Sequence, residues 1–143
     1  MSTTIELLSR QHQEVLERLP DTAGGTPLTT VQIAEMIGYL RGEVLEHFEL
    51  EERGLFPVLG RYIGHGHGPL AVMEHEHAAF RQLLDELSAA HAAGRLEAQR
   101  ECAGALVALL QEHIAKEDHV LFPLALRMLT PEDIGEVDAA MAA

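Results

Sequence analysis

Two closely spaced histidines are the first candidates for chemistry in this 143-residue chain, which contains nine histidines. His75 and His77 are separated by one residue. An α-helix advances about 100° per residue, so the two side chains cannot share a face. His77 lies on the same apolar stripe as Met73 and Phe80, whereas His75 lies about 200° from Met73 around the helix axis. We therefore expect His77 to face the interior and His75 to face solvent.

Further histidines and glutamates interrupt the apolar faces of the other predicted helices. His47 and Glu51 are one helical turn apart, as are His113 and Glu117, and His12 lies on the first predicted helix. Burying one such side chain without a partner costs several kcal/mol, and six would consume the stability of a small domain. A bound metal removes this cost. The candidate metal ligands are therefore His12, His47, Glu51, His77, His113 and Glu117.

The ligand types indicate which metal is expected and how many ions. Four histidines and two glutamates are too many for one tetrahedral zinc. They suit two ions, each with two terminal histidines, bridged by Glu51 and Glu117. Imidazole and carboxylate ligands are compatible with iron, manganese or zinc, and we favour iron over the other two. A ferritin-like site would need Glu-x-x-His on two helices, and only Glu74 and His77 have that spacing.

The elements that must position these residues are predicted to be helices. Apolar periodicity and breaking residues predict helices over about residues 3–19, 31–54, 70–92 and 95–121, with breaks around Pro20 and Pro57 and a perturbed helix end at Pro123. Thr130, Pro131 and Asp133 predict the start of a short helix over about residues 131–141. Short connections predict an all-α, up-down-up-down four-helix bundle over about residues 3–124, in a single domain covering residues 1–143.

An internal repeat supports this arrangement. The segment HFELEERGLFP (47–57) is followed 66 positions later by HIAKEDHVLFP (113–123). Both contain His-x-x-x-Glu and end in Leu-Phe-Pro. At nearly the same separation, His12 corresponds to His77. Each half of the chain therefore contributes the same ligand pattern.

Composition excludes several classes of function. A net charge of −13 disfavours nucleic-acid binding. No apolar run approaches about 18 residues, so we expect no membrane span. The single cysteine allows no internal disulfide, which is consistent with a reducing compartment. The first residues lack a basic stretch followed by an apolar run, so a cytoplasmic location is expected.

The motifs resemble the hemerythrin-like (HHE cation-binding) family. The resemblance rests on His12, on HFELE, on MEHEHAAFR, on HIAKED and on the paired LFP segments, and it spans about residues 8–124. It implies a four-helix bundle with a non-haem di-iron centre, in which an oxo or hydroxo group bridges the two iron ions. The ligands that it implies are the same six residues.

Two positions depart from the pattern of oxygen-carrying hemerythrins. Those proteins usually have a fifth histidine where this chain has Met73. They also usually place an aspartate five residues after the last histidine, where Asp118 stands, but Glu117 lies closer to the apolar face. With four histidines, coordination space remains for a small molecule. This favours reaction with, or sensing of, O2, peroxide or NO over reversible oxygen carriage.

Several functions are compatible with such a centre. We expect a diatomic or peroxide ligand, and enzymatic turnover is undecided. The main alternative is an iron- or oxygen-responsive regulatory or metal-storage module without turnover. Repair of iron centres ranks low, because relatives with that role typically carry an extra N-terminal domain with cysteines, and a metal-free interaction bundle ranks lower still. The substrate, the reductant and the oligomeric state remain open.

Overall fold

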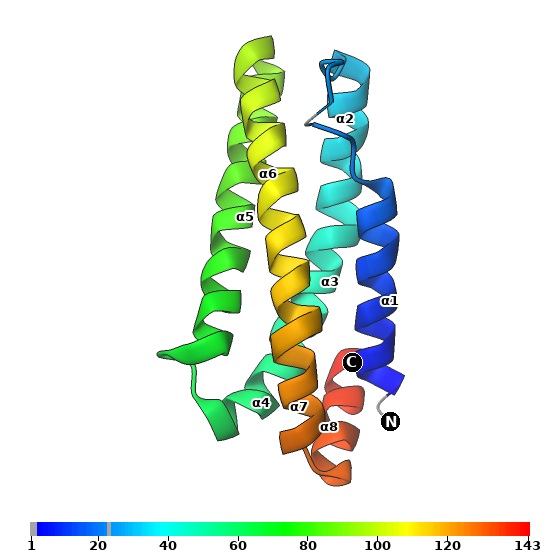
Figure 1. Ribbon diagram of the computed structural model, residues 1–143, viewed down its shortest axis with the longest axis vertical. Helices are drawn as coiled ribbons and strands as arrows, with labels where there is room; N and C mark the ends of the chain where they lie inside the picture. The colour runs from blue at the N-terminus through cyan, green and yellow to red at the C-terminus, as the bar shows by residue number, and fades with distance from the viewer. Residues whose placement is uncertain (1–2, 23) are drawn as a thin grey trace.

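The computed structural model describes residues 3–22 and 24–143, and over these residues it is an up-down-up-down bundle of four helical rods (Figure 1). The first rod is α1 (Thr3–Arg18) and the third is α5 (Gly68–Ala92). The other rods contain π-helical segments, labelled η. The second comprises α2 (Thr30–Tyr39), η1 (Leu40–Val44), α3 (Leu45–Leu50), η2 (Glu51–Leu55) and α4 (Phe56–Ile63); the fourth comprises α6 (Leu96–Lys116), η3 (Glu117–Leu121) and α7 (Phe122–Met128). The predicted fold class is confirmed.

The predicted connections hold with small changes. Thr29 caps α2 through a capping box with Gln32. The expected break at residues 20–27 is present on both sides of residue 23, which lies outside the described residues. Gly64 and Gly94, at the ends of α4 and α5, have φ angles of 76° and 69°, which favour glycine. Within the described parts of the chain, the structure has no helix suited by length and hydropathy to crossing a membrane.

The prediction that Pro57 breaks its helix is wrong, and Pro123, which was predicted to perturb a helix end, also lies within a continuous rod. Each proline lies in the first turn of the helix that follows a π segment. In both cases the preceding phenylalanine donates its backbone N–H five residues back, from Phe56 to Glu51 and from Phe122 to Glu117. The wider turn places the proline where a missing N–H is tolerated. The two rods therefore continue to Ile63 and Met128.

The π segments also change which side chains face inward. A one-residue insertion rotates everything after it by about 100°. Within η3, Val120 is 49% exposed, whereas Leu121 is buried. On α1 the inward-facing residue is Val15, whereas Leu16 is 38% exposed.

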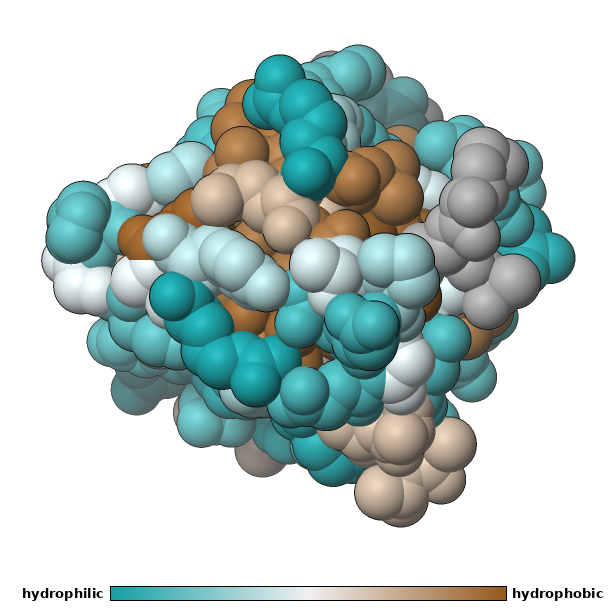
Figure 2. Space-filling model, turned by 90° about the horizontal axis from the view of Figure 1, so that it is seen from below, coloured by the Kyte–Doolittle hydropathy of each residue, from teal (hydrophilic) through white to brown (hydrophobic). Residues whose placement is uncertain are grey.

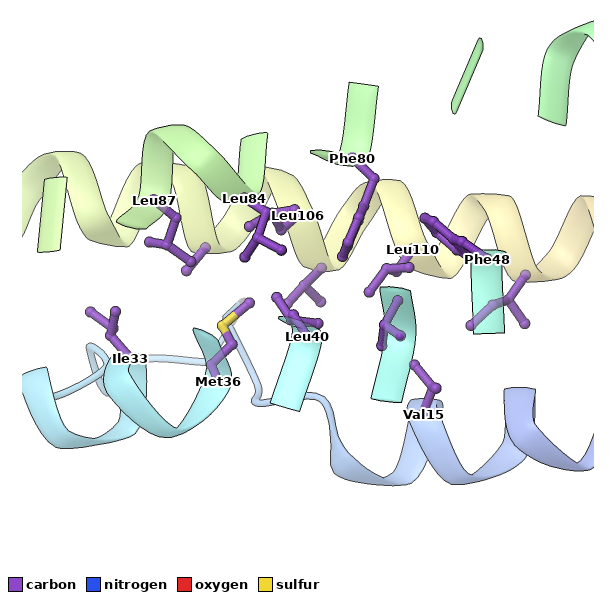
Figure 3. Packing of buried hydrophobic residues seen from close by; sticks show 14 of the residues in the cluster. Val15, Ile33, Met36, Leu40, Phe48, Phe80, Leu84, Leu87, Leu106 and Leu110 are labelled. Carbon is purple, nitrogen blue, oxygen red and sulfur yellow. The ribbon is translucent and has the colours of Figure 1, made fainter. Parts of the chain in front are cut away.

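The apolar core has two parts. One part, around Leu40, Phe80 and Leu106, fills the half of the bundle towards α2 (Figure 3). The other, around Leu59 and Leu70, fills the half towards α4 and α7. Along each rod the candidate ligands lie near the point where one cluster ends and the other begins, with Phe48 and Ile114 of the first cluster beside them, so a polar layer divides the core.

The short helix α8 (Pro131–Ala142) closes the end of the bundle towards α4 and α7 (Figure 1). Its predicted capping box between Thr130 and Asp133 is confirmed. The helix packs on η2, where Gly54 leaves room for Met141 and where Arg53 donates to the carbonyls of Ala140 and Met141. Figure 2 shows this end, with apolar side chains visible between hydrophilic ones.

Candidate metal centre

The structure brings all six candidate ligands to one place in the bundle interior. Each rod contributes one histidine, and the second and fourth rods each add a glutamate. None of the six side chains is more than 4% exposed, and Glu51 and Glu117 are fully buried. His75, by contrast, is exposed, as the helix geometry predicted.

The inward-facing atoms are close enough to share metal ions. They form two groups within which every candidate ligand atom lies within 4.8 Å of the others. The first group is His12, His47, Glu51 and Glu117, and the second is Glu51, His77, His113 and Glu117. Both glutamates belong to both groups. Nε2 of His12 lies 2.9 Å from Glu117 Oε1, and Nε2 of His77 lies 3.2 Å from Glu51 Oε1.

The donor set fits a pair of cations. Both carboxylate oxygens of Glu51, one oxygen of Glu117 and the Nε2 atoms of His77 and His113 are buried without a hydrogen-bond partner. Native proteins rarely bury such atoms unpaired, because each costs about 1–3 kcal/mol. A metal ion in each group would satisfy these atoms together.

The outward nitrogen of each histidine is held by a side-chain oxygen. Every Nδ1 atom has such an oxygen at 2.6–2.9 Å, and every partner is adjacent in sequence to a candidate ligand on another rod. The pairs are His12 with Asp118, His47 with Gln11, His77 with Glu52 and His113 with Glu76. With Nδ1–H donating outward, each Nε2 is free to ligate.

A further layer holds these oxygens in place. Arg81 donates to both oxygens of Glu52, at 2.7 and 2.8 Å. Lys116 pairs with Glu76, and Ser9 donates to Asp118. Such outer contacts orient the ligands and fix their tautomers.

Aromatic rings cover the histidines unevenly. The Phe48 ring stacks on His77 with centroids 3.8 Å apart and planes 7° apart. Phe122 is parallel to His12 at the longer separation of 5.3 Å. The position of Phe48 corresponds, in the internal repeat, to Ile114. Aromatic rings therefore cover the His77–His113 half of the site more closely than the other half.

The pKa values of the candidate ligands reflect ionisable groups crowded together in a buried site. Burial, followed by the neighbouring Glu117, raises the pKa of Glu51 well above its usual value. Burial opposes ionisation of Glu117, but contacts with Glu51 and three histidines hold its pKa well below the usual value. Burial lowers the pKa values of His47 and His77. Ionisation is therefore disfavoured at Glu51 and favoured at Glu117.

The two unusual positions have distinct surroundings. Met73 is buried in the core cluster beside the site and offers no nitrogen. Asp118 contacts the outward nitrogen of His12, while Glu117 faces the centre. Glu74, the ferritin-like alternative, contacts His65 in the surface loop.

The sequence analysis missed the four outer oxygens and the stacking of Phe48. Gln11, Glu52, Glu76 and Asp118 each stand next to a candidate ligand, and this adjacency was the available signal. It was not sufficient, because each contact crosses to a different helix.

Comparison with known proteins agrees with this geometry. The family model described as "Hemerythrin HHE cation binding domain" matches residues 3–125. The chain is 30% identical to the iron-sulfur cluster repair protein YtfE of Edwardsiella ictaluri, over 84% of this chain and 63% of the relative. It is also 30% identical to the protein of that name from Yersinia pseudotuberculosis, over 85% of this chain and 63% of the relative. The chain thus spans 63% of the length of these relatives.

Proposed function

Because the chain belongs to the hemerythrin HHE cation-binding domain family, we propose that its interior site holds two iron ions and binds or reacts with a small oxidant. The ligands in this proposal are His12, His47, Glu51, His77, His113 and Glu117. A single domain built from the described helices holds them. Zinc and manganese are the less favoured occupants.

One observation carries the proposal. Glu51 and Glu117 each belong to both groups of candidate ligand atoms, and three of their four oxygens are buried without a hydrogen-bond partner. Two buried carboxylates shared between two pairs of histidines match the demands of two neighbouring cations. In a metal-free core the same two buried carboxylates would be destabilising.

The residues around the site suit reaction with a small molecule. Bound iron would supply redox chemistry towards O2, peroxide or NO. The chain itself orients the four imidazoles through their Nδ1 contacts, and it excludes bulk water because the ligands are almost fully buried. Met73 adds no fifth imidazole, so coordination space stays open.

The first test is metal content and spectrum. Protein loaded anaerobically with iron and then exposed to air is expected to contain about two irons per chain and to show near-ultraviolet charge-transfer absorption. Glu117→Gln should lose iron and this absorption, because it removes a shared carboxylate. Asp118→Asn should keep two irons with weaker binding. The exposed Glu112→Gln is the matched control. Two irons retained in Glu117→Gln would refute the ligand assignment.

A second candidate function is favoured by the relatives. The proteins matched at 30% identity are named for iron-sulfur cluster repair. The same centre would then be a store from which iron is supplied to clusters. This revises the low rank that the sequence analysis assigned to repair.

Two experiments distinguish the two functions. Iron-loaded protein is mixed with peroxide in one experiment and with a cluster-depleted acceptor protein in another. Rapid spectral change with peroxide and retention of iron would support the oxidant reaction. Transfer of iron to the acceptor, with little response to peroxide, would support supply.

A further inference from the structure

A small cavity reaches one candidate ligand of the metal centre. It lies between α1 and the η1–α3 stretch, and its volume is about 100 Å³. Gln11, Val15 and His47 form its inner wall. Glu14, Glu43 and Glu46 also line it, and their side chains are exposed. The larger cavities, which lie beside Met36, Leu50 and Val72, contain none of the six candidate ligands.

The internal repeat supplies a comparison within the same molecule. In the other half, the position of Val15 is taken by Phe80 and that of Glu14 by Ala79. Phe80 is fully buried and contacts the Phe48 ring edge-on at 5.0 Å. Figure 3 shows Phe80 reaching inward from α5, whereas the smaller Val15 projects from α1.

The charged residues differ between the halves in the same way. Glu43 corresponds to Leu109, which packs on the core. Gln11 corresponds to Glu76, which is paired with Lys116 and His113. The third carboxylate, Glu46, corresponds to another glutamate, Glu112. The second half therefore has an aromatic wall and an ion pair, and it lacks acidic counterparts of Glu14 and Glu43.

We propose that this cavity is the passage by which divalent cations enter and leave the metal centre, reaching the position held by His12 and His47 first. The proposal rests on the metal centre proposed above but not on its redox chemistry. His47 forms the end of the passage, and Gln11 holds its Nδ1 atom at 2.6 Å. The partner of His47 is a neutral amide, whereas the other three histidines have carboxylate partners. Nε2 of His47 lies 3.4 Å from Glu51 Oε2, a buried carboxylate oxygen without a hydrogen-bond partner, which would receive the cation.

The carboxylates at the mouth have a clear physical role. Charge of one sign around a narrow opening raises the local concentration of the opposite ion and accelerates association by about 10- to 1000-fold. Salt screens such attraction over about 10 Å at 0.1 M ionic strength. Uptake by this route should therefore be fast at low salt and slower at high salt.

The electrostatic test uses Co²⁺ as a coloured probe. Metal-free protein is mixed with Co²⁺ in a stopped-flow spectrometer, and uptake is followed by visible absorption. The variant Glu14→Gln/Glu43→Gln/Glu46→Gln should take up Co²⁺ about tenfold more slowly at low ionic strength, with the difference shrinking in high salt. When uptake is complete, the parent and the triple variant should each hold two ions per chain.

The matched control removes the same charge elsewhere. Glu6→Gln/Glu86→Gln/Glu101→Gln changes three exposed glutamates away from the cavity. Its uptake should stay within about twofold of the parent at the same salt concentration. An equal slowing in both triple variants would overturn the proposal, because net charge alone would then set the rate.

A steric test narrows the same passage with one variant and widens it with another. Val15→Phe copies the residue of the closed half and should slow removal of the first Co²⁺ by a chelator. Val15→Ala widens the passage and should accelerate that removal. This second variant keeps the proposal testable if Val15→Phe does not fold. Unchanged rates of Co²⁺ removal in a Val15 variant that binds two ions would refute the proposed passage but not the proposed metal centre. A parent chain that binds no metal would instead refute the proposed function.

Discussion

At the scale of single residues, the outer hydrogen bonds prepare the site for a metal. Glu52 shows this most clearly, because it accepts from His77 and receives both arms of Arg81. Burial opposes its ionisation, but His77 and Arg81 lower the pKa of Glu52 to about 2. It is therefore a permanent anion at neutral pH, and it directs Nε2 of His77 inward.

Removing this anion should weaken metal binding. We expect Glu52→Gln to raise the dissociation constant for Zn²⁺ or Fe²⁺ by about 10- to 100-fold, as is usual for such outer partners. Competition with a coloured chelator measures the constant. Glu49→Gln, exposed on the same rod, is the control for charge and should differ little. An equal loss in both variants would show that Glu52 acts only through net charge.

The protonation of His12 predicts a pH dependence of the metal-free protein. Burial alone would lower the pKa of His12, but Asp118 and Glu117 raise it from 6.5 to about 9. The folded state therefore holds this proton more tightly than the unfolded state. The resulting stabilisation is complete below pH 6.5 and is lost as the pH rises through about 9.

The measurement compares metal-free parent with metal-free His12→Gln. Urea unfolding at several pH values should show that the advantage of the parent shrinks as the pH rises from 6.5 to 9. Using the difference between the two proteins removes the contribution of the other titrating groups. An advantage that grows with pH would contradict the assigned role of Asp118 and Glu117.

At the scale of elements, the π segments set the geometry of the site. Both η2 and η3 begin at a candidate bridging glutamate, and both end immediately before Phe-Pro. Each wide turn keeps its rod continuous past a proline and turns Leu55 and Leu121 into the core. π segments occur often at functional sites, where they redirect side chains. Here they allow His-x-x-x-Glu and the following apolar residues to face the same interior.

The contact between η2 and α8 can be tested at Gly54. A Cβ atom at this position would lie only 2.4 Å from Met141 Cγ and 3.3 Å from the Val137 carbonyl. We expect Gly54→Ala to lower the free energy of unfolding by about 1–3 kcal/mol, because α8 must shift. Adding Met141→Ala should recover part of the loss.

A second glycine provides the control for this prediction. Gly104 lies inside α6, and a Cβ atom there would meet nothing within 4 Å. Gly104→Ala should therefore stabilise the protein by about 0.5–1 kcal/mol, through helix propensity. Urea unfolding measures all these variants. If Gly54→Ala behaved like Gly104→Ala, α8 would not pack on η2 as described.

At the scale of the whole molecule, a polar layer divides an otherwise apolar bundle. The six buried candidate ligands separate the two core clusters, and several of their atoms have no partner in the chain. Such a layer weakens the metal-free fold. A cation bound only by the folded state shifts the equilibrium back by mass action.

This balance predicts opposite effects with and without metal. The variant Glu51→Met should be more stable than the parent when both are metal-free, by about 1–3 kcal/mol, because an apolar side chain replaces a buried carboxyl group whose oxygens have no hydrogen-bond partner. Added Zn²⁺ or Fe²⁺ should raise the melting temperature of the parent and leave that of the variant nearly unchanged. A metal-free parent more stable than the variant would mean that the polar layer supports itself.

The sequence by itself determined the fold class and the six residues that meet in the interior. Both depend on local periodicity: an α-helix repeats every 3.6 residues, so His77 is separated from His75 and Glu117 lies below His113 without knowledge of any neighbour. The capping residue Thr130 was readable for the same reason, since its cap involves residues three positions apart.

The tertiary structure decided the features that depend on distances between helices. The pairing of His47 with Gln11 and of His113 with Glu76 crosses the bundle, and no spacing within one helix encodes it. The wide turns at Glu51 and Glu117 arise where proline and packing override the ordinary hydrogen-bond ladder. The cavity at His47 exists because Val15 is smaller than its counterpart Phe80 and because the bundle places it beside a ligand. Only the assembled helices show that the two halves of a repeated sequence form unequal sides of one site.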